Sequence, residues 1–145
     1  TRIGVVHQDC QFLDHLSIAD NVALPLTVQD KPLGSELYDL LGWVGLSDRM
    51  HAFPPELSGG ERQRAALARA VILSPDVILA DEPTGNIDWD MSQRVLQLLV
   101  ELNKMGKTVM VATHDIALIR AAKPQVSTRI LRISNKGLQS AGAEL

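Results

Sequence analysis

Hydrophobic residues in this chain follow two kinds of pattern, short apolar runs and repeats at helical spacing. Apolar runs at residues 3–6, 77–80 and 108–112 each end in polar residues, which predicts three buried β-strands. The run at residues 77–80 is continuous, as expected for a central parallel strand that helices cover on both faces. Because strands alternate with helical segments, the pattern predicts an α/β fold with a parallel sheet.

Repeats at helical spacing predict the helices between these strands. One helix follows Ser17, a suitable N-cap, although Pro25 argues against a long uninterrupted helix there. Further helices are expected from their apolar faces at residues 37–44, 58–73, 89–105 and 116–122. Two shorter features complete the pattern: a rigid, extended linker at residues 53–56 (FPPE), and a terminal hairpin from residues 129–134 and 138 onward.

The stretch between Gln11 and Glu56 has no clear strand, so we expect a helical subdomain there. A length of 145 residues fits one domain or most of one. We predict three parts. Residues 1–10 form the first strand and its polar end, and residues 11–75 form a helical subdomain together with the helix after Ser58. Residues 76–145 form the rest of the α/β core.

Composition narrows the class of protein. A formal net charge of −3 argues against a non-specific nucleic-acid binder, because such proteins need a basic surface. The single cysteine, Cys10, excludes an internal disulfide and fits a reducing compartment. No apolar run reaches the roughly 18 residues that a membrane span needs.

Polar side chains stand directly after each predicted strand: Gln8, then Asp81 and Glu82, then His114. In parallel sheets, ligands bind beyond the carboxyl ends of the strands. Because side chains alternate along a strand, the two adjacent carboxylates point in different directions. One can hold Mg²⁺ while the other orients or deprotonates an attacking water, and His114 can bind a phosphate. Each residue by itself could also mark no more than the start of a surface loop.

Residues 57–61 (LSGGE) open the third expected helix. Ser58 and Glu61 have the spacing of a capping box. Gly59 and Gly60 leave the backbone N–H groups of the helix N-terminus bare, an arrangement that binds anions such as phosphate. The same helix carries three arginines, of which we expect at least two on a solvated face: Arg62, Arg64 and Arg69.

These motifs resemble those of the ATP-binding cassette (ABC) ATPases. Residues 57–61 match the signature loop, residues 77–83 (VILADEP) the Walker B strand, and residues 85–88 (GNID) the D-loop. Gln8 resembles the Q-loop glutamine and His114 the switch histidine. The resemblance implies a P-loop NTPase-like parallel sheet with an ABC helical subdomain, and hydrolysis of ATP with Mg²⁺.

The resemblance also implies a role for each site residue. Asp81 would bind Mg²⁺ through water, and Glu82 would be the catalytic carboxylate that acts on the attacking water. Gln8 would touch the metal and the lytic water, and His114 would contact the γ-phosphate. Two copies would close head-to-tail as a homodimer. Ser58, Gly59, Gly60 and Glu61 would bind the ATP held by the opposite copy, and Asp88 would lie at the dimer interface.

Residues 79–86 (LADEPTGN) are typical of an ABC subgroup that serves lipoprotein release, macrolide export or cell division. Residues 53–54 (FP) and 112–115 (ATHD) look most like the cell-division type, which works with an integral membrane protein. This resemblance implies a peripheral protein on the cytoplasmic face of the inner membrane. The P-loop pattern GxxxxGK[ST] is absent from the 145 residues. We therefore expect that an N-terminal segment is missing and that this chain alone binds ATP poorly.

Two other classes of function remain open. A truncated copy could be a non-catalytic interaction module that dimerises with a full-length relative, although the retained Glu82 and His114 argue mildly against this. The ABC-type heads of DNA-repair or chromosome-structuring proteins interrupt the cassette with long heptad arms. No such arm is present in this sequence, so we expect no nucleic-acid partner.

Overall fold

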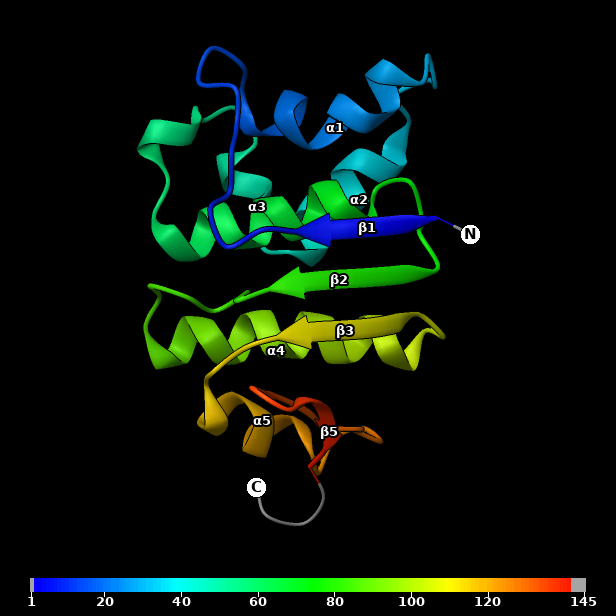
Figure 1. The fold of residues 1–145 in the computed structure, drawn as a ribbon. Helices are drawn as coiled ribbons and strands as arrows, with labels where there is room; N and C mark the ends of the chain where they lie inside the picture. Colours follow the sequence, from blue (N-terminus) through cyan, green and yellow to red (C-terminus); the bar gives the residue numbers. More distant parts are fainter. Residues whose placement is uncertain (1, 142–145) are drawn as a thin grey trace.

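The computed structural model describes residues 2–141, which form a three-stranded sheet, five α-helices and a separate hairpin (Figure 1). Short 3₁₀ turns lie at Ser47–Arg49 and Pro54–Glu56. The helices and strands are, in chain order, β1 (Ile3–Val6), α1 (Ile18–Val28), α2 (Ser35–Trp43), α3 (Gly59–Val71), β2 (Val77–Asp81), α4 (Trp89–Lys104), β3 (Thr108–Ala112), α5 (Ile116–Ala122), β4 (Leu131–Ser134) and β5 (Gly137–Ser140). The expected α/β class is therefore confirmed.

The strand β2 lies between β1 and β3 and runs parallel to both. The register pairs Val6 with Ala80 and Asp81 with Ala112. The first two strands are far apart in the sequence, yet they are hydrogen-bonded neighbours. The carboxyl ends of all three strands therefore meet at one edge of the sheet, on the left in Figure 1.

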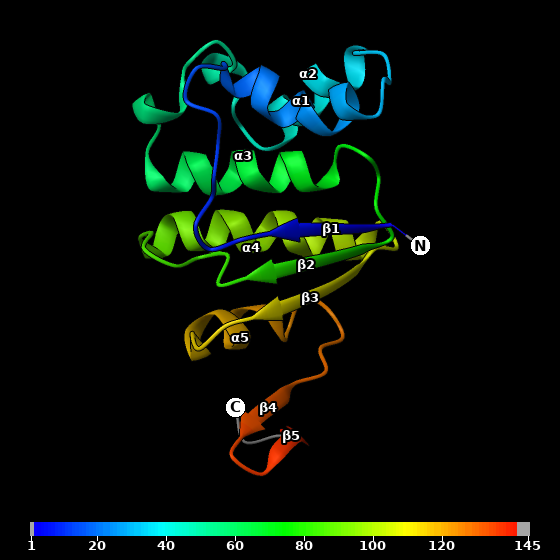
Figure 2. The same ribbon diagram turned by 45° about the horizontal axis from the view of Figure 1, so that its top comes forward.

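Only one face of the sheet is covered by helices in the part of the chain that the structure describes. The helices α3 and α4 lie behind the strands in Figure 1, and Figure 2 shows α4 at the level of β1 with α3 above it. Ile78 and Ala80 point to this side and are 0% and 2% exposed. On the opposite side Leu79 is half-buried, and Val5 and Met110 are exposed. The expectation that helices cover the central strand on both faces is therefore wrong for residues 2–141.

A glycine lets α3 approach β1 closely. A Cβ atom at Gly4 would collide with the backbone carbonyl oxygen of Ala70, near the end of α3. Any side chain at this position would push the helix away from the sheet. The close packing of β1 against α3 is therefore built into the first strand.

The segment between β1 and α3 is helical, as predicted, and α1 and α2 form a further layer on α3 (Figure 2). Ser17 caps α1, because its hydroxyl oxygen accepts a hydrogen bond of 3.2 Å from the backbone N–H of Asp20. Pro25 lies inside α1, which continues to Val28. The helix persists because it buries an apolar face against its neighbours, formed by Ile18, Val22 and Leu26.

Residues 53–56 do not form the expected extended linker. Pro54–Glu56 form a single 3₁₀ turn, in which the N–H of Glu56 donates to the carbonyl of Phe53 at 2.9 Å. Two prolines suit this turn, because residues at the start of a helical turn need no N–H partner and take the fixed φ of proline. The chain therefore turns rather than extends before it enters α3.

Asn21 provides a test of how the helical segment is held together. Its side chain is fully buried, accepts a bond of 2.8 Å from the N–H of Leu13, and places its amide nitrogen 3.0 Å from the carbonyl oxygens of Leu13, Leu16 and Ser17. We expect Asn21→Leu to lower the free energy of unfolding by about 2–4 kcal/mol, because it leaves these backbone groups without a partner. Urea denaturation measures the change.

A matched control lies at the exposed end of α4. The side chain of Asn103 makes a single bond, of 3.1 Å, to the carbonyl of Lys107. We expect Asn103→Leu to change the free energy of unfolding by less than about 1 kcal/mol. Equal losses in the two variants would contradict the structural role of Asn21.

Candidate functional site

Three of the predicted site residues come together at the carboxyl edge of the sheet. Gln8 follows β1, Glu82 follows β2 and His114 follows β3, and the parallel register brings these strand ends side by side. Gln8 also lies against the loop after β2, since a Cβ atom at Gly85 would be 3.0 Å from its side-chain nitrogen. The strand ends therefore form one polar cluster from residues far apart in the chain.

Glu82 is the most constrained member of this cluster. Its backbone has a φ of 44°, a left-handed value that is uncommon for a residue with a side chain. Its N–H donates to the carbonyl of Ala112 at 2.7 Å, which continues the β2–β3 pairing by one residue. Strained backbone of this kind persists where neighbouring bonds enforce it, and it concentrates at functional sites.

The carboxylate of Glu82 receives hydrogen bonds from the tip of β3 on both oxygens. Oε1 accepts the backbone N–H of His114 at 3.0 Å and lies 2.7 Å from Nδ1 of the same residue. Oε2 accepts the hydroxyl of Thr113 at 3.1 Å. The side chain of Glu82 is 17% exposed and that of His114 is 89% exposed. The carboxylate is thus held in place, whereas the imidazole ring can reach a ligand.

Asp81 is the candidate metal ligand at the same edge. It ends β2, is exposed, and precedes Glu82 directly. Among residues 2–141 there is no group of three or more His, Cys, Asp or Glu side chains that could hold a metal ion. Magnesium commonly binds one or two carboxylates and keeps several waters. Asp81 places a carboxylate at this edge of the sheet, and Gln8, after β1, brings a side-chain amide to the same edge.

The capping box predicted at the start of α3 is present. The N–H of Glu61 donates to the hydroxyl oxygen of Ser58 at 3.2 Å, and the N–H of Ser58 donates to Oε1 of Glu61 at 3.0 Å. This backbone bond lowers the pKa of Glu61, and a nearby Arg49, at 3.2 Å, acts in the same direction. The contribution of ionised Glu61 to stability is therefore complete above the ordinary glutamate pKa and is lost as the pH falls through the lowered pKa.

The two glycines of the LSGGE segment differ in their surroundings. Gly60 is buried, and a Cβ atom there would lie 3.0 Å from the side chain of Met91 on α4. Gly59 is exposed and faces Ile87 only at ordinary contact distance. The interpretation that both glycines exist to admit an anion needs correction for Gly60, because close packing of α3 on α4 also requires the absence of a side chain.

The three arginines of α3 are not on a solvated face, which corrects that expectation. Each binds a backbone carbonyl of the preceding segment: Arg62 that of Pro54 at 3.2 Å, Arg64 that of Val44 at 2.9 Å, and Arg69 that of Gln11 at 2.7 Å. Burial lowers the pKa of Arg64 and Arg69. The arginines therefore join the helical segment to α3, and the site does not draw on them.

Two residues that contact this cluster or the loops beside it were not predicted as site residues from the sequence. Thr113 contacts the carboxylate of Glu82, as described above. Gln63 of α3 is buried, donates to the carbonyl of Pro83 at 2.7 Å and contacts the thiol of Cys10. Burial raises the pKa of that thiol. Thr113 is a polar residue between an apolar strand and His114, and this position could have indicated a site residue. Gln63 looks like any other polar residue on a helix, so its sequence position gave no such indication.

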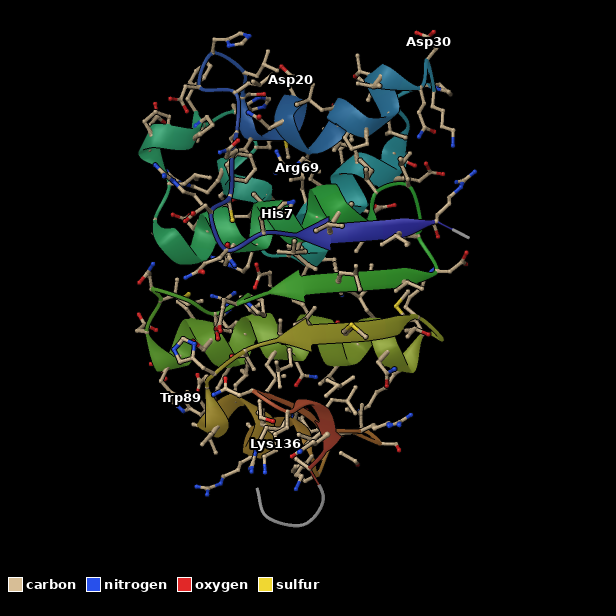
Figure 3. The ribbon with its side chains drawn as sticks, in the orientation of Figure 1. His7, Asp20, Asp30, Arg69, Trp89 and Lys136 are labelled. Carbon is tan, nitrogen blue, oxygen red and sulfur yellow. The ribbon has the colours of Figure 1, made fainter. Side chains whose placement is uncertain are left out.

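Asp88 caps α4, since its side chain accepts the N–H of Met91 at 2.9 Å. Asp88 is exposed, and so is the next residue, Trp89. Figure 3 shows Trp89 at the edge of the molecule to which the strand ends point. The start of α3 lies toward the same side in Figure 1, so the glycine-rich segment and the strand-end cluster share one side of the molecule.

Comparison with known proteins identifies the family. The sequence model of the ABC transporter family matches residues 1–85, and the chain belongs to this family. Its fold is also that of the family: a dimeric post-hydrolysis structure of the ATP-binding cassette MJ0796, bound to ADP and Pi, matches with a TM-score of 0.73 and 36% identity. That match covers 82% of this chain and 55% of the cassette. The expected fold class and family are confirmed.

The most similar relatives include proteins named cell division ATP-binding protein FtsE. That of Haemophilus influenzae is 44% identical over 122 residues, covering 82% of this chain and 56% of the relative. That of Escherichia coli K12 is 46% identical over 121 residues, covering 81% and 54%. That of Streptococcus pneumoniae D39 is 37% identical over 142 residues, covering 93% and 62%. The chain thus spans little more than half the length of these relatives, and its resemblance to the cell-division type is confirmed.

Proposed function

We propose that this chain is part of the ATP-binding and ATP-hydrolysing subunit of a bacterial ABC-type membrane complex of the FtsE cell-division type. The observation that carries the proposal is the Glu82 carboxylate, held at the end of the central strand by the tip of β3 beside Gln8. A carboxylate fixed at a strand end, with an exposed histidine on it, suits the activation of a water molecule beside a phosphate.

Each residue of the strand-end cluster has a role in this proposal. Glu82 orients the attacking water and takes its proton. The imidazole of His114, which is largely exposed, turns to hydrogen-bond the terminal phosphate of ATP. Asp81, through water, and Gln8 would hold Mg²⁺, which would supply positive charge beside the phosphates. Gln8 also contacts the lytic water.

The glycine-rich segment serves ATP on a second copy of the chain in a head-to-tail homodimer. Ser58, Gly59, Gly60 and Glu61 supply the helix N-terminus that faces the phosphate, and Asp88 lies at the interface. Three observations support this arrangement: Gly59 is exposed, Trp89 beside Asp88 is 43% exposed, and the solved cassette that matches this chain is dimeric. Exposed aromatic residues are enriched in protein interfaces.

The partner in the membrane is an FtsX-like integral protein, which this subunit meets from the cytoplasmic face. No helix of residues 2–141 is long and apolar enough to cross a membrane. Residues 11–56 carry seven acidic and two basic side chains, although the whole chain has a net charge of only −3. Cytoplasmic loops of membrane proteins are rich in Lys and Arg. Charge complementarity therefore supports docking of the partner on residues 11–56 of the helical subdomain (residues 11–75). Residues 1–10 and 76–145 form the catalytic core.

Replacement of the catalytic carboxylate tests the proposed activity. We expect Glu82→Gln in the intact native protein to lower kcat for ATP hydrolysis by at least about 100-fold, because an amide cannot take a proton from water. ATP binding should persist, since the amide still occupies the same space. Phosphate release and binding of radiolabelled Mg-ATP measure the two effects.

Glu101→Gln is the matched control for this change. It alters the same chemical group on α4, where Glu101 only accepts a 2.6 Å bond from the indole N–H of Trp43. We expect its kcat to stay within about twofold of the parent. Unchanged hydrolysis in Glu82→Gln would remove Glu82 from its role, and an intact protein without any hydrolysis would favour the non-catalytic interaction module.

Charge reversal on α1 tests the docking of the membrane partner. Asp20 lies on the outer layer of the molecule (Figure 3) and lines a pocket with Tyr38 and His51 between α1 and α2. We expect Asp20→Lys to reduce the amount of FtsX-like protein that co-purifies in mild detergent, because like charges repel. Gln97→Lys also introduces a lysine, on α4, and should leave co-purification unchanged. Equal capture by the parent and both variants would contradict docking on this face.

A further inference from the structure

Thr113 is the residue beside the strand-end cluster whose contacts the proposed reaction does not yet use. It lies between β3 and His114, and its hydroxyl makes two hydrogen bonds. It donates to Oε2 of Glu82 at 3.1 Å and accepts the backbone N–H of Asp115 at 3.0 Å. A hydroxyl has a single proton, so the bond to the carboxylate is the only one that this hydroxyl can donate.

The three donors on Glu82 differ in what they can do when a phosphate arrives. The imidazole of His114 is 89% exposed, and turning it toward a phosphate breaks its contact with Oε1. The backbone N–H of His114 stays on Oε1, and the hydroxyl of Thr113 stays on Oε2. One donor then remains on each oxygen, which is the minimum that fixes both the position and the rotation of a carboxylate.

We propose that Thr113 is a positioning residue for ATP hydrolysis, which acts by holding the carboxylate of Glu82 in the orientation that accepts a proton from water. This inference rests on the proposed function of Glu82. The left-handed backbone of Glu82 departs from the strand, so regular β-structure does not set the direction of its side chain. The bond from Thr113 supplies the missing constraint from the neighbouring strand.

Two substitutions at this position separate the hydroxyl from the shape of the side chain. Thr113→Val keeps the shape and removes the donor, and Thr113→Ser keeps the donor and removes only the methyl group. In the intact native protein we expect Thr113→Val to lower kcat for ATP hydrolysis about tenfold or more, with KM for ATP within about twofold, because small misplacement of a reacting group is costly. Thr113→Ser should restore kcat to within about threefold of the parent.

A control variant separates positioning from the stability of the following helix. Asp115 caps α5, because its side chain accepts the N–H of Leu118 at 3.2 Å, a bond made within the helix and not to Glu82. We expect Asp115→Ala to lower Tm at least as much as Thr113→Val does, and to change kcat by less than about twofold. If kcat fell in proportion to Tm in both Asp115→Ala and Thr113→Val, Thr113 would have a structural role only.

The combined variant Glu82→Gln/Thr113→Val completes the test. If Thr113 acts through Glu82, the second change should lower the residual kcat by less than about twofold, because the group that it positions is already gone. A further tenfold loss in that background, a low kcat in Thr113→Ser, or parental kcat in a folded Thr113→Val would each overturn the inference. No hydrolysis by the parent would instead overturn the proposed function and this inference with it.

Discussion

The site depends on the parallel pairing of β2 with β3. This pairing continues one residue beyond the strand, where the N–H of Glu82 donates to the carbonyl of Ala112, and it brings the Glu82 carboxylate under the tip of β3. Thr113 and His114 can bind that carboxylate only because the two strands end at the same level. A slip of the register by one residue would leave the two strand ends at different levels and separate the Glu82 carboxylate from Thr113 and His114.

The helix α3 connects this edge to the rest of the molecule. Its N-terminus carries the capping box of Ser58 and Glu61, and its arginines hold the carbonyls of the helical segment. Gln63 on the same helix donates to the carbonyl of Pro83, directly after Glu82. One helix therefore contacts the helical segment and the loop after β2, and it carries the glycine-rich segment proposed to face a second copy.

Much of the fold and of the site could be predicted from the sequence. Apolar runs ending in Gln8, in Asp81 and Glu82, and before His114 mark three parallel strands, and parallel strands bring their carboxyl ends together whatever their separation in the chain. The capping box was equally predictable, because it depends on local spacing alone.

The features that the sequence did not reveal depend on contacts between distant segments. Gly60 looked like a ligand contact, but it packs on Met91 of α4. The arginines were expected to be solvated, because the spacing of residues along a helix does not show which backbone carbonyls of distant segments need a hydrogen-bond donor. The arginines supply that donor. The inference about Thr113 depends on the bond from its hydroxyl to Glu82, a residue with a positive φ, and no local sequence pattern predicts either feature.

In the proposed dimer, the strand-end cluster of one copy and the glycine-rich segment of another enclose the same nucleotide. The most direct test is the native mass of the intact Glu82→Gln protein in Mg-ATP. We expect two copies with two ATP molecules, and monomers that still hold ATP once Gly59→Asp is added. Monomers that bind ATP before that change, or a doubly loaded dimer that survives it, would rule out this arrangement.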